Sequence, residues 1–445
     1  MPGLAYDVVI IGGGVVGTSA GITLLQREGL KVAIIEKADF DNYRIGESLS
    51  PGARPLLEYL KVWNRFEKEQ SLTSYGSHGA WSSEESVAFD FLFTTHGPGW
   101  SLDRIRFDQM LFETFVERGG STFLKSTFKK ASHNNGKWTI ELSDENELLS
   151  NITTQFILDA TGRQGVFSKH MKATRIVYDR LIGVGNVGKI PSSLKVSANV
   201  MVEACEYGWW YSAPVPEGQV ATVLMTDSDI ASKLNCTDSS DWKRLLEAMP
   251  LTSERVKGVV FDKAPKAYAA YSSVLTEPGG EGWLAVGDAV ASHDPLSSSG
   301  IPHAMGSGIQ GAIVALNELS GRKDAYKAFD EGIQKDFIQY LKTHWQYYSM
   351  VERWPNALFW KRRTTSIKID PQAVIGSIGS VESLSEFGTT HLSKKGVIDL
   401  LETCKRGQVV HETIRGFKKA HPQYPDQQLI LSFQELVENE LIELV

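Results

Sequence analysis

The chain has 445 residues, of which 42% are hydrophobic and 22% charged, as expected for a globular protein of two or three domains. Lysine and arginine total 46 against 53 acidic residues, and the resulting net charge of −7 argues against a general nucleic-acid-binding protein. The cysteines (Cys205, Cys236 and Cys404) form no C-x-x-C pair, and no apolar run approaches about 18 residues. A disulfide scaffold, a structural zinc site and a membrane span are therefore not expected.

The first predicted elements, up to residue 36, have the order strand, helix, strand. Residues 8–11 are an apolar β-branched run that predicts a buried strand, residues 15–27 have helical periodicity, and residues 31–35 predict a second strand. The corner before the helix reads G-x-G-x-x-G, with glycines at Gly12, Gly14 and Gly17. Here Gly12 permits the tight turn, Gly14 lets the backbone approach a pyrophosphate, and Gly17 allows close packing of helix on strand. Glu36 would accept hydrogen bonds from an adenosine ribose, so the unit predicts a dinucleotide site.

Two other segments match the glycine pattern without its context. Gly183–Gly188 is followed by Pro191 and two serines where a helix would be required. Gly306–Gly311 lies inside a predicted helix at residues 300–319, with no strand before it. Because each glycine destabilises a helix by roughly 1 kcal/mol relative to alanine, we expect another part of the chain to approach this helix closely.

The rest of the chain alternates between two kinds of segment. Strand-like pieces at residues 71–100 and a Val-, Trp- and Tyr-rich stretch at residues 181–225 predict a second sheet. Other segments return to the first domain: a helix at 106–118, strands near 138–142 and 151–158 joined by a turn at 143–147, and a strand ending at Gly287-Asp288. Beyond Gly321 the chain reads as helices.

We therefore expect an α/β protein with a discontinuous, Rossmann-like nucleotide-binding domain at residues 1–70, 101–175 and 272–330. A substrate-binding domain built on a mixed β-sheet, residues 71–100 and 176–271, is inserted into it. Residues 331–445 form a helical C-terminal region.

Four motifs, in this order, resemble flavoprotein monooxygenases of the p-hydroxybenzoate hydroxylase type. They are the glycine corner with Glu36, Arg104-x-x-Phe107-Asp108, Asp159-Ala-Thr-Gly162 and Gly287-Asp288. The resemblance implies FAD as the cofactor, with Asp288 at its ribityl and pyrophosphate groups and Arg104 beside it. The implied FAD contacts are Gly12, Gly14, Val15, Gly17, Glu36, Lys37, Arg44, Ser48, Arg104, Asp288, Pro295, Ser299, Gly300 and Ile301.

Three further segments, Ile45–Pro51, Gly208–Pro214 and Asp294–Ile301, are similar to the flavin-dependent halogenase branch of these enzymes. Two departures favour hydroxylation over halogenation. Tryptophan halogenases need a lysine that carries hypohalous acid to the substrate, and the corresponding segment, Ser74–Trp81, contains no lysine. They also place a glutamate where this chain has Ser297. Without the lysine, direct transfer of oxygen from the flavin is expected.

Within this branch the motifs look most like the flavoproteins that mature tryptophylquinone enzymes. The resemblance implies an FAD-dependent monooxygenase that uses O2 and NADH or NADPH. Its substrate would be a tryptophan in a partner quinoprotein precursor, on the route to cysteine or lysine tryptophylquinone. Two alternatives remain: a hydroxylase or halogenase of a small aromatic, possibly carrier-bound metabolite, and a flavin-bearing assembly factor without turnover. The sequence chooses neither the nicotinamide reductant nor the oligomeric state.

Four side chains are candidates for catalysis: Glu47, His78, His293 and His303. His293 and His303 flank the predicted flavin turn, where each could move a proton or serve as a structural histidine. Glu47 follows Gly46 beside the cofactor, or caps a helix, and His78 lies in the segment that carries the halogenase lysine. A helix follows the turn before Pro302, and the backbone amides of its first turn would stabilise the anionic reduced flavin.

Aromatic residues recur in two further places. Trp81, Trp209, Trp210 and Tyr211 are expected to line the substrate pocket and exclude water, or else to belong to the core. Aromatic and basic residues at 345–363 predict either packing on the flavin domain or a docking surface for a protein substrate. The histidines show no H-x-x-x-H or H-E-x-x-H spacing, so no metal site is expected. The first strand begins by Asp7 without room for a leader, and we expect a cytoplasmic protein.

Overall fold

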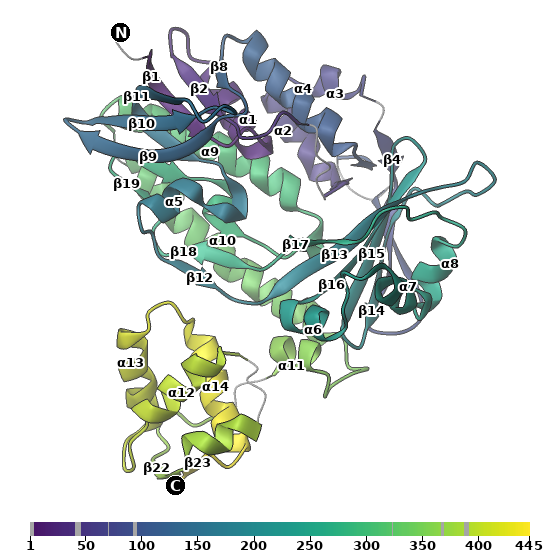
Figure 1. Cartoon of the computed structure of the whole chain (residues 1–445), viewed down its shortest axis with the longest axis vertical. Helices are drawn as coiled ribbons and strands as arrows, with labels where there is room; N and C mark the ends of the chain where they lie inside the picture. Colours follow the sequence, from purple (N-terminus) through teal and green to yellow (C-terminus); the bar gives the residue numbers. More distant parts are fainter. Residues whose placement is uncertain are drawn as a thin grey trace.

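The structure of the chain, a computed structural model, describes residues 4–40, 46–69, 71–91, 96–322, 324–365, 369–386 and 391–445. In Figure 1 the N-terminal nucleotide-binding region and a second sheet lie side by side, and a small C-terminal unit lies at the opposite end of the long axis. The α/β fold class predicted from the sequence is confirmed. Among the residues described, no helix is both long and apolar enough to cross a membrane.

The nucleotide-binding region is built on an eight-stranded sheet in which β20, β11, β1, β2 and β8 pair in parallel in that order. Their bounds are β1 Leu4–Ile11, β2 Val32–Ile35, β8 Ser121–Phe123, β11 Leu149–Asp159 and β20 Trp283–Ala285. Antiparallel strands complete the sheet: β9 Thr127–Asn134, β10 Lys137–Ser143 and β19 Gly279–Gly280. Because the parallel strands come from separate stretches of chain, their carboxyl ends bring distant residues to one edge, where open α/β sheets bind ligands.

Two helices pack against each other on this sheet, α1 (Val15–Leu24) and α9 (Gly300–Leu319). A Cβ at Gly308 would lie 2.4 Å from the Val16 carbonyl oxygen, and one at Gly311 would lie 2.3 Å from Val286. The close approach predicted for α9 is therefore confirmed, because only glycine leaves room for these contacts. The remaining helices of this region are α2 (Arg54–Tyr59), α3 (Trp63–Phe66), α4 (Arg104–Glu117) and α5 (Val166–His170).

The second sheet has seven strands in the order β17–β13–β16–β15–β14–β5–β6, all antiparallel except the β14–β5 pair. Their bounds are β5 Gly76–Ala80, β6 Val87–Asp90, β13 Leu181–Lys189, β14 Val200–Cys205, β15 Gly208–Val215, β16 Gln219–Asp227 and β17 Lys266–Ala269. The glycine pattern at 183–188 lies within strand β13, as its context predicted. The helices of this region are α6 (Ser228–Lys233), α7 (Ser239–Glu247) and α8 (Pro250–Arg255).

Two small sheets lie in segments that lead to the carboxyl edge of the main sheet. One contains β3 (Ser48–Leu49), β7 (Gly99–Ser101) and β4 (Leu72–Ser74). The other contains β12 (Arg175–Val177), β18 (Ser273–Leu275) and β21 (Ala291–Ser292). Through β3 and β21 they deliver Glu47 and His293 to that edge.

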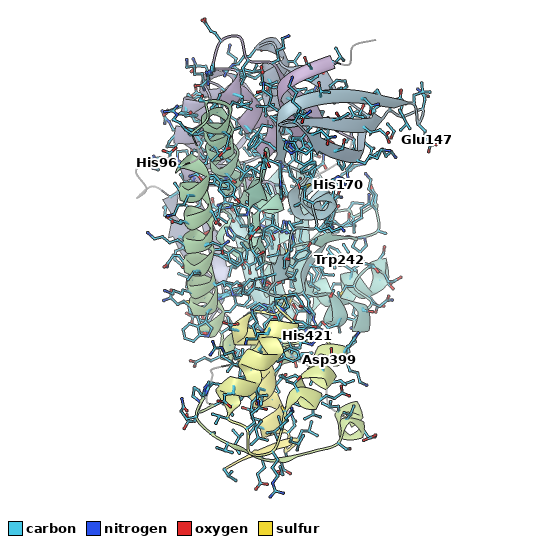
Figure 2. All side chains as sticks on the ribbon, turned by 90° about the vertical axis from the view of Figure 1, so that its left-hand side faces the viewer. His96, Glu147, His170, Trp242, Asp399 and His421 are labelled. Carbon is cyan, nitrogen blue, oxygen red and sulfur yellow. The ribbon has the colours of Figure 1, made fainter. Side chains whose placement is uncertain are left out.

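The C-terminal region begins with α10 (Asp324–Ser349) and α11 (Leu358–Thr364). Most of α10 packs on the nucleotide-binding region, while the end of α10 and α11 pack on the second sheet. The last residues form a unit with its own apolar core, made of α12 (Lys394–Thr403), α13 (Val410–Ala420) and α14 (Asp426–Glu438). In Figure 2 this unit, marked by Asp399 and His421, lies below the sheet region marked by Trp242. It is not purely helical, because β22 (Ile375–Ile378) pairs with β23 (Ile442–Leu444).

Candidate functional site

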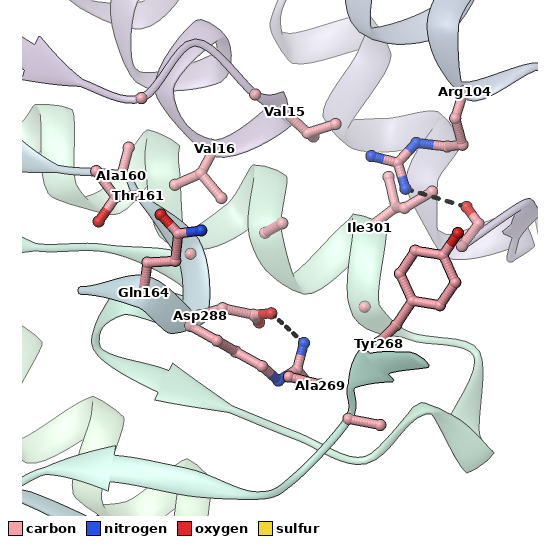
Figure 3. Close-up of a pocket in the computed structure, with 18 of the residues that line it drawn as sticks. Val15, Val16, Arg104, Ala160, Thr161, Gln164, Tyr268, Ala269, Asp288 and Ile301 are labelled. Atoms are coloured by element: carbon pink, nitrogen blue, oxygen red, sulfur yellow. Dashed lines mark hydrogen bonds and ion pairs between the residues drawn. The ribbon is translucent and has the colours of Figure 1, made fainter. Parts of the chain in front are cut away.

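A cavity of ≈ 660 Å³ opens at the carboxyl edge of the parallel sheet (Figure 3). This volume lies within the range of about 300–1,000 Å³ that small-molecule and cofactor sites occupy. Many of the residues predicted to bind FAD, act in catalysis or line the substrate pocket do line it: Gly12, Gly14, Val15, Glu36, Lys37, Glu47, Ser48, Arg104, Tyr211, Asp288, His293, Pro295, Gly300, Ile301 and His303. The structure thus gathers side chains from almost 300 residues of sequence around one space.

The glycine corner follows β1 directly. Gly12 has a φ of +106°, and a Cβ there would lie 2.4 Å from the Ala160 carbonyl oxygen. Gly17 does not line the cavity; a Cβ there would lie 1.9 Å from the Gly12 carbonyl oxygen, so glycine is required for α1 to start beside the strand. The first-turn amides of α1 have no partner within the helix, and together with its dipole they suit a phosphate.

Glu36 is buried at the end of β2 and holds the corner through its carboxylate. Gly13 N donates to Oε2 at 2.6 Å and Ala38 N donates to Oε1 at 2.9 Å. Each carboxylate oxygen carries two lone pairs, so both retain the capacity to accept from a ribose hydroxyl. Lys37 Nζ, also at the cavity, donates to Gln164 Oε1 at 3.1 Å.

Arg104 is the first residue of α4, whose N-cap residue Asp103 accepts hydrogen bonds from the next helical amides. Its Nε and Nη2 donate to the two carboxylate oxygens of Asp108 at 3.1 and 3.2 Å. Its Nη1 donates to the Gly46 carbonyl oxygen at 3.3 Å. A bidentate pair of this kind fixes the plane of the guanidinium, which lies at the cavity in Figure 3.

Asp288 lies in a 3₁₀ turn, Gly287–Ala289, directly after β20. Arg163 Nη1 donates to Asp288 Oδ2 at 2.6 Å, and Arg163 Nη2 donates to the His293 carbonyl oxygen at 2.6 Å. Sequence reasoning did not identify Arg163, which lines the cavity. Its place immediately after Asp159-Ala-Thr-Gly162 is the signal that would have found it. Arg163 thereby ties the Asp159 turn to both Asp288 and the turn before α9.

The imidazoles of His293 and His303 face each other, with ring centroids 4.5 Å apart. Burial, with smaller contributions from the neighbouring His303 and Arg163, lowers the pKa of His293 to about 3 against the opposing effect of Asp294. Burial also lowers the pKa of His303. Within the part of the chain that the structure describes, Nε2 of each ring has no hydrogen-bond partner. Both rings are therefore neutral near pH 7 and have a nitrogen to offer a bound molecule.

Glu47 is fully buried and interacts with two phenols that line the same cavity. Burial raises the pKa of Tyr211 well above its ordinary value, and Glu47 adds to the rise through its charge and a hydrogen bond that Tyr211 donates. Burial and Glu47 likewise raise the pKa of Tyr268, which is labelled in Figure 3. The result is a carboxylate beside two phenols that stay protonated.

The turn predicted to lie beside the flavin immediately precedes α9. Pro295–Ser297 form a 3₁₀ turn, Ser298 is left-handed with φ +50°, and Ser299 holds the N-cap position of α9. Gly300 and Ile301 then present the N-terminus of a 20-residue helix to the cavity. Such a terminus favours negative charge in the bound molecule.

Several predicted residues lie elsewhere. His78, on β5, is 3.2 Å from Asn199 Nδ2 and does not line the cavity. The four aromatic residues do not form one lining, because successive side chains of a strand point to opposite faces. Trp210 packs against Trp242 with ring centroids 5.4 Å apart, while Trp209 and Trp81 belong to a cluster on the other face. Only Tyr211 of the four reaches the cavity, and Arg44 lies outside the described residues.

The residues at the cavity fit FAD. The glycine corner offers backbone amides where a Cβ would clash, and Lys37, Arg104 and Arg163 supply positive charge. Two imidazoles have unpartnered nitrogens among the described residues, and an α9 terminus faces the same space. The fold and this site together define an FAD-dependent enzyme of the monooxygenase type. Among the described residues no group of three or more His, Cys, Asp or Glu could hold a metal ion.

Comparison with known proteins agrees with that class. The chain belongs to the "FAD binding domain" family, whose model matches residues 5–317. It is 30% identical over 362 residues to the putative FAD-dependent oxidoreductase LodB of Marinomonas mediterranea, an alignment that covers 81% of this chain and 97% of that protein. It is 25% identical over 435 residues to a tryptophan 2-halogenase of Chondromyces crocatus, covering 94% of this chain and 80% of that one.

Solved structures show the same fold. The myxobacterial chondrochloren halogenase CndH superposes with a TM-score of 0.75 at 20% identity, covering 82% of this chain and 87% of that one. The flavin-dependent halogenase CmlS superposes with a TM-score of 0.74 at 16% identity, covering 98% of this chain and 78% of that one.

Proposed function

We propose that this enzyme hydroxylates a tryptophan side chain in a partner precursor protein, as a step in forming a tryptophylquinone cofactor. The observation that carries the proposal is the set of side chains that line the cavity away from the glycine corner. The segment Ser74–Trp81, which corresponds to the lysine-bearing segment of tryptophan halogenases, has no lysine and contributes no residue to the cavity. A buried carboxylate, Glu47, and two phenols line that part instead.

The substrate class rests on resemblance. The motifs Gly76-x-x-x-Ala80-Trp81, Gly208–Pro214 and Asp294–Ile301 look like those of flavoproteins that mature tryptophylquinone enzymes. The similarity to LodB over nearly its whole length supports this branch, since that protein is described as an oxidoreductase and not as a halogenase. An aromatic ring of an extended protein segment would occupy the part of the cavity at Glu47.

The side chains of this protein would accept the substrate proton and orient the reacting groups. FAD, when bound, supplies the activation of oxygen. The ring carbon that gains oxygen must lose its hydrogen as a proton, and Glu47 would accept it. Tyr211 and Tyr268, which stay protonated, would orient the carboxylate and exclude water from it. The neutral imidazoles of His293 and His303 would offer a hydrogen bond to the bound cofactor.

We further propose NADH or NADPH as the external reductant. One oxygen atom of O2 enters the substrate, the other leaves as water, and the nicotinamide supplies the two electrons. The three cysteines are free and buried, which agrees with a reaction in the reducing cytoplasm.

The test combines the FAD-loaded protein, NADH or NADPH, oxygen and a purified quinoprotein precursor. We expect nicotinamide oxidation that the precursor stimulates, and one precursor tryptophan heavier by one oxygen atom in peptide mass mapping. A precursor with phenylalanine at that tryptophan is the matched control and should not stimulate turnover. Turnover without any oxygen in the precursor would refute the proposal.

A second candidate is halogenation of a small aromatic molecule. The observation in its favour is the alignment with tryptophan 2-halogenase, which spans 94% of this chain. Reduced enzyme supplied with bromide and small indoles or phenols separates the two: a brominated product would favour this candidate and count against the hydroxylase.

A further inference from the structure

The buried carboxylate of Asp294 stands at the start of the turn that leads into α9. Asp294 is 5% exposed and lines the cavity. Its Oδ1 accepts a hydrogen bond from Leu296 N at 3.0 Å, which caps the 3₁₀ turn Pro295–Ser297. The orientation of this one side chain therefore sets how the turn approaches the N-terminus of α9.

Three side chains from one face of α10 converge on Asp294. Tyr348 Oη donates to Asp294 Oδ2 at 2.6 Å, and His344 Nε2 lies 3.3 Å from the same oxygen. Tyr340 Oη accepts a hydrogen bond from Asp294 N at 2.9 Å. Residues 340, 344 and 348 are spaced by four, so they lie along one stripe of the helix. The stripe thus holds both the side chain and the backbone of Asp294.

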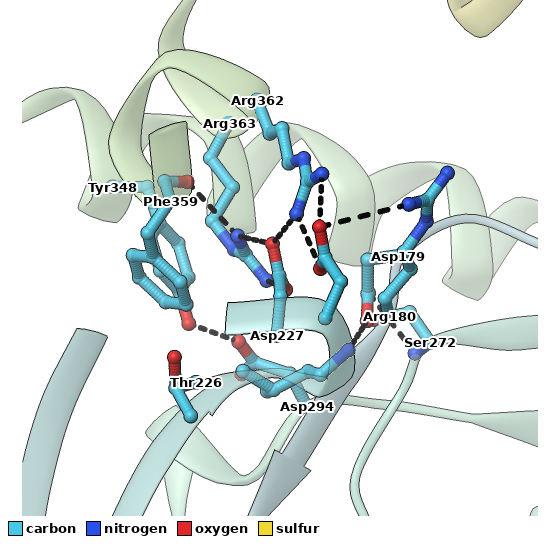
Figure 4. A network of polar contacts seen from close by, with 12 residues as sticks. Asp179, Arg180, Thr226, Asp227, Ser272, Asp294, Tyr348, Phe359, Arg362 and Arg363 are labelled. Carbon is cyan, nitrogen blue, oxygen red and sulfur yellow. Dashed lines mark hydrogen bonds and ion pairs between the residues drawn. The ribbon is translucent and has the colours of Figure 1, made fainter. Parts of the chain in front are cut away.

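Tyr348 is itself fixed from other directions (Figure 4). Trp209 Nε1 donates to Tyr348 Oη at 2.9 Å, and the Arg363 guanidinium lies 5.3 Å from the centre of the tyrosine ring. Arg363 is in turn paired with the buried carboxylate of Asp227 at 2.7 Å. Because Tyr348 is completely buried, its hydroxyl has little freedom to turn away from Asp294.

The charge of Asp294 depends on these donors. Burial alone would raise its pKa, but a hydrogen bond and an electrostatic contribution from His344, with hydrogen bonds from Tyr348 and the amide of Leu296, bring the pKa below its ordinary value. Burial raises the pKa of Tyr348 well above its ordinary value, so Tyr348 remains a donor. Among the described residues, Asp294 forms no ion pair with lysine or arginine where it lines the cavity, and the basic side chain that pairs with it is His344.

We propose that Tyr348, His344 and Tyr340 are positioning residues for the flavin: they act through Asp294 to hold the turn before α9 and to keep a negative charge beside the bound cofactor. These three residues lie beyond residue 317, where the match to the FAD-binding family model ends. The C-terminal region therefore completes the flavin site. The inference rests on the flavin site and is independent of the substrate.

The test is a double-mutant cycle on the FAD-loaded protein without substrate, read out as the flavin midpoint potential and absorption spectrum. Asp294→Asn removes the charge, so the affinity for reduced over oxidised FAD should rise about tenfold, the order expected for losing one charged interaction. Tyr348→Phe should shift the potential in the same direction by a smaller amount. In the Asp294→Asn background Tyr348→Phe should add nothing, because its only route to the flavin is gone.

The matched control is Tyr326→Phe, which removes a phenol from the same helix that donates to the Gly279 carbonyl oxygen at 3.0 Å. It should leave the potential and the spectrum unchanged. If Tyr348→Phe yields no folded protein, His344→Gln takes its place in the cycle. Equal shifts from the α10 variant in the wild-type and Asp294→Asn backgrounds would overturn the proposal, as would an unchanged potential in Asp294→Asn. Absence of tryptophan hydroxylation would leave the result of this cycle unaffected.

Discussion

The two ends of the cavity are built on different principles. At the corner end, defined by Gly12–Gly17 and Glu36, the binding groups are backbone amides held by glycines that lie close together in sequence. At the turn end, defined by Glu47, Tyr211, His293 and Asp294, the groups are side chains brought from three remote segments. The corner end suits any dinucleotide, and under the proposed function the turn end would determine which chemistry the cofactor performs.

Breaking the corner end should have the largest effect. In Gly17→Ala the new Cβ would lie 1.9 Å from the Gly12 carbonyl oxygen, so α1 must move away from β1. We expect purified protein without flavin and a loss of stability of at least about 1–3 kcal/mol, typical of overpacking. Gly52→Ala is the control, because a Cβ there meets nothing within 4 Å. Flavin content and melting temperature measure both, and a flavin-replete Gly17→Ala protein would contradict the role given to the corner.

Breaking the turn end should spare the cofactor and stop the chemistry. Glu47→Gln keeps the shape of the buried side chain but removes the carboxylate that Tyr211 contacts. If Glu47 accepts the substrate proton, turnover should fall by about 10²–10⁴-fold while FAD stays bound. Precursor-stimulated nicotinamide oxidation and flavin absorbance measure the two quantities separately. Ser126→Ala, which removes a hydroxyl from another position that lines the cavity, serves as the comparison variant, and equal losses in both would assign Glu47 a structural role.

The tie between Asp288 and the turn end can be tested at Arg163. This side chain bonds Asp288 and the His293 carbonyl oxygen, each at 2.6 Å. Arg163→Gln loses a charge-assisted hydrogen bond, and FAD affinity should weaken by about 10- to 100-fold. Arg106→Gln removes a guanidinium from an exposed pair with Glu217 and should leave the affinity unchanged. Titration of the apoprotein with FAD measures the affinity, and unaltered binding in Arg163→Gln would show that the cofactor does not depend on this tie.

The same contrast explains what the sequence could predict. The corner end is local, so a strand, three glycines and Glu36 were enough to place it, and the glycines of α9 correctly indicated a close approach. Adjacent Trp209 and Trp210 could not share one face of a strand, and that alternation was visible in the sequence. The contact of Asp294 with Tyr340, His344 and Tyr348 spans 46 to 54 residues and follows only from how α10 lies against the turn. No local pattern marks such a contact.

The smallest effect concerns the pH dependence of stability at the turn end. The pKa of His293 is about 3 in the folded protein, well below its ordinary value of 6.5. Between these pH values the unfolded chain binds a proton at His293 that the folded protein does not bind. The contribution of His293 to the free energy of unfolding is therefore complete above pH 6.5 and declines as the pH falls toward 3. The slope is at most about 1.4 kcal/mol per pH unit.

We expect the melting temperature of the apoprotein to fall less between pH 7 and about pH 5 in His293→Gln than in the wild type. His411→Gln, which changes an exposed imidazole on α13, should follow the wild type. Parallel curves for His293→Gln and the wild type would show that His293 is not held neutral by burial.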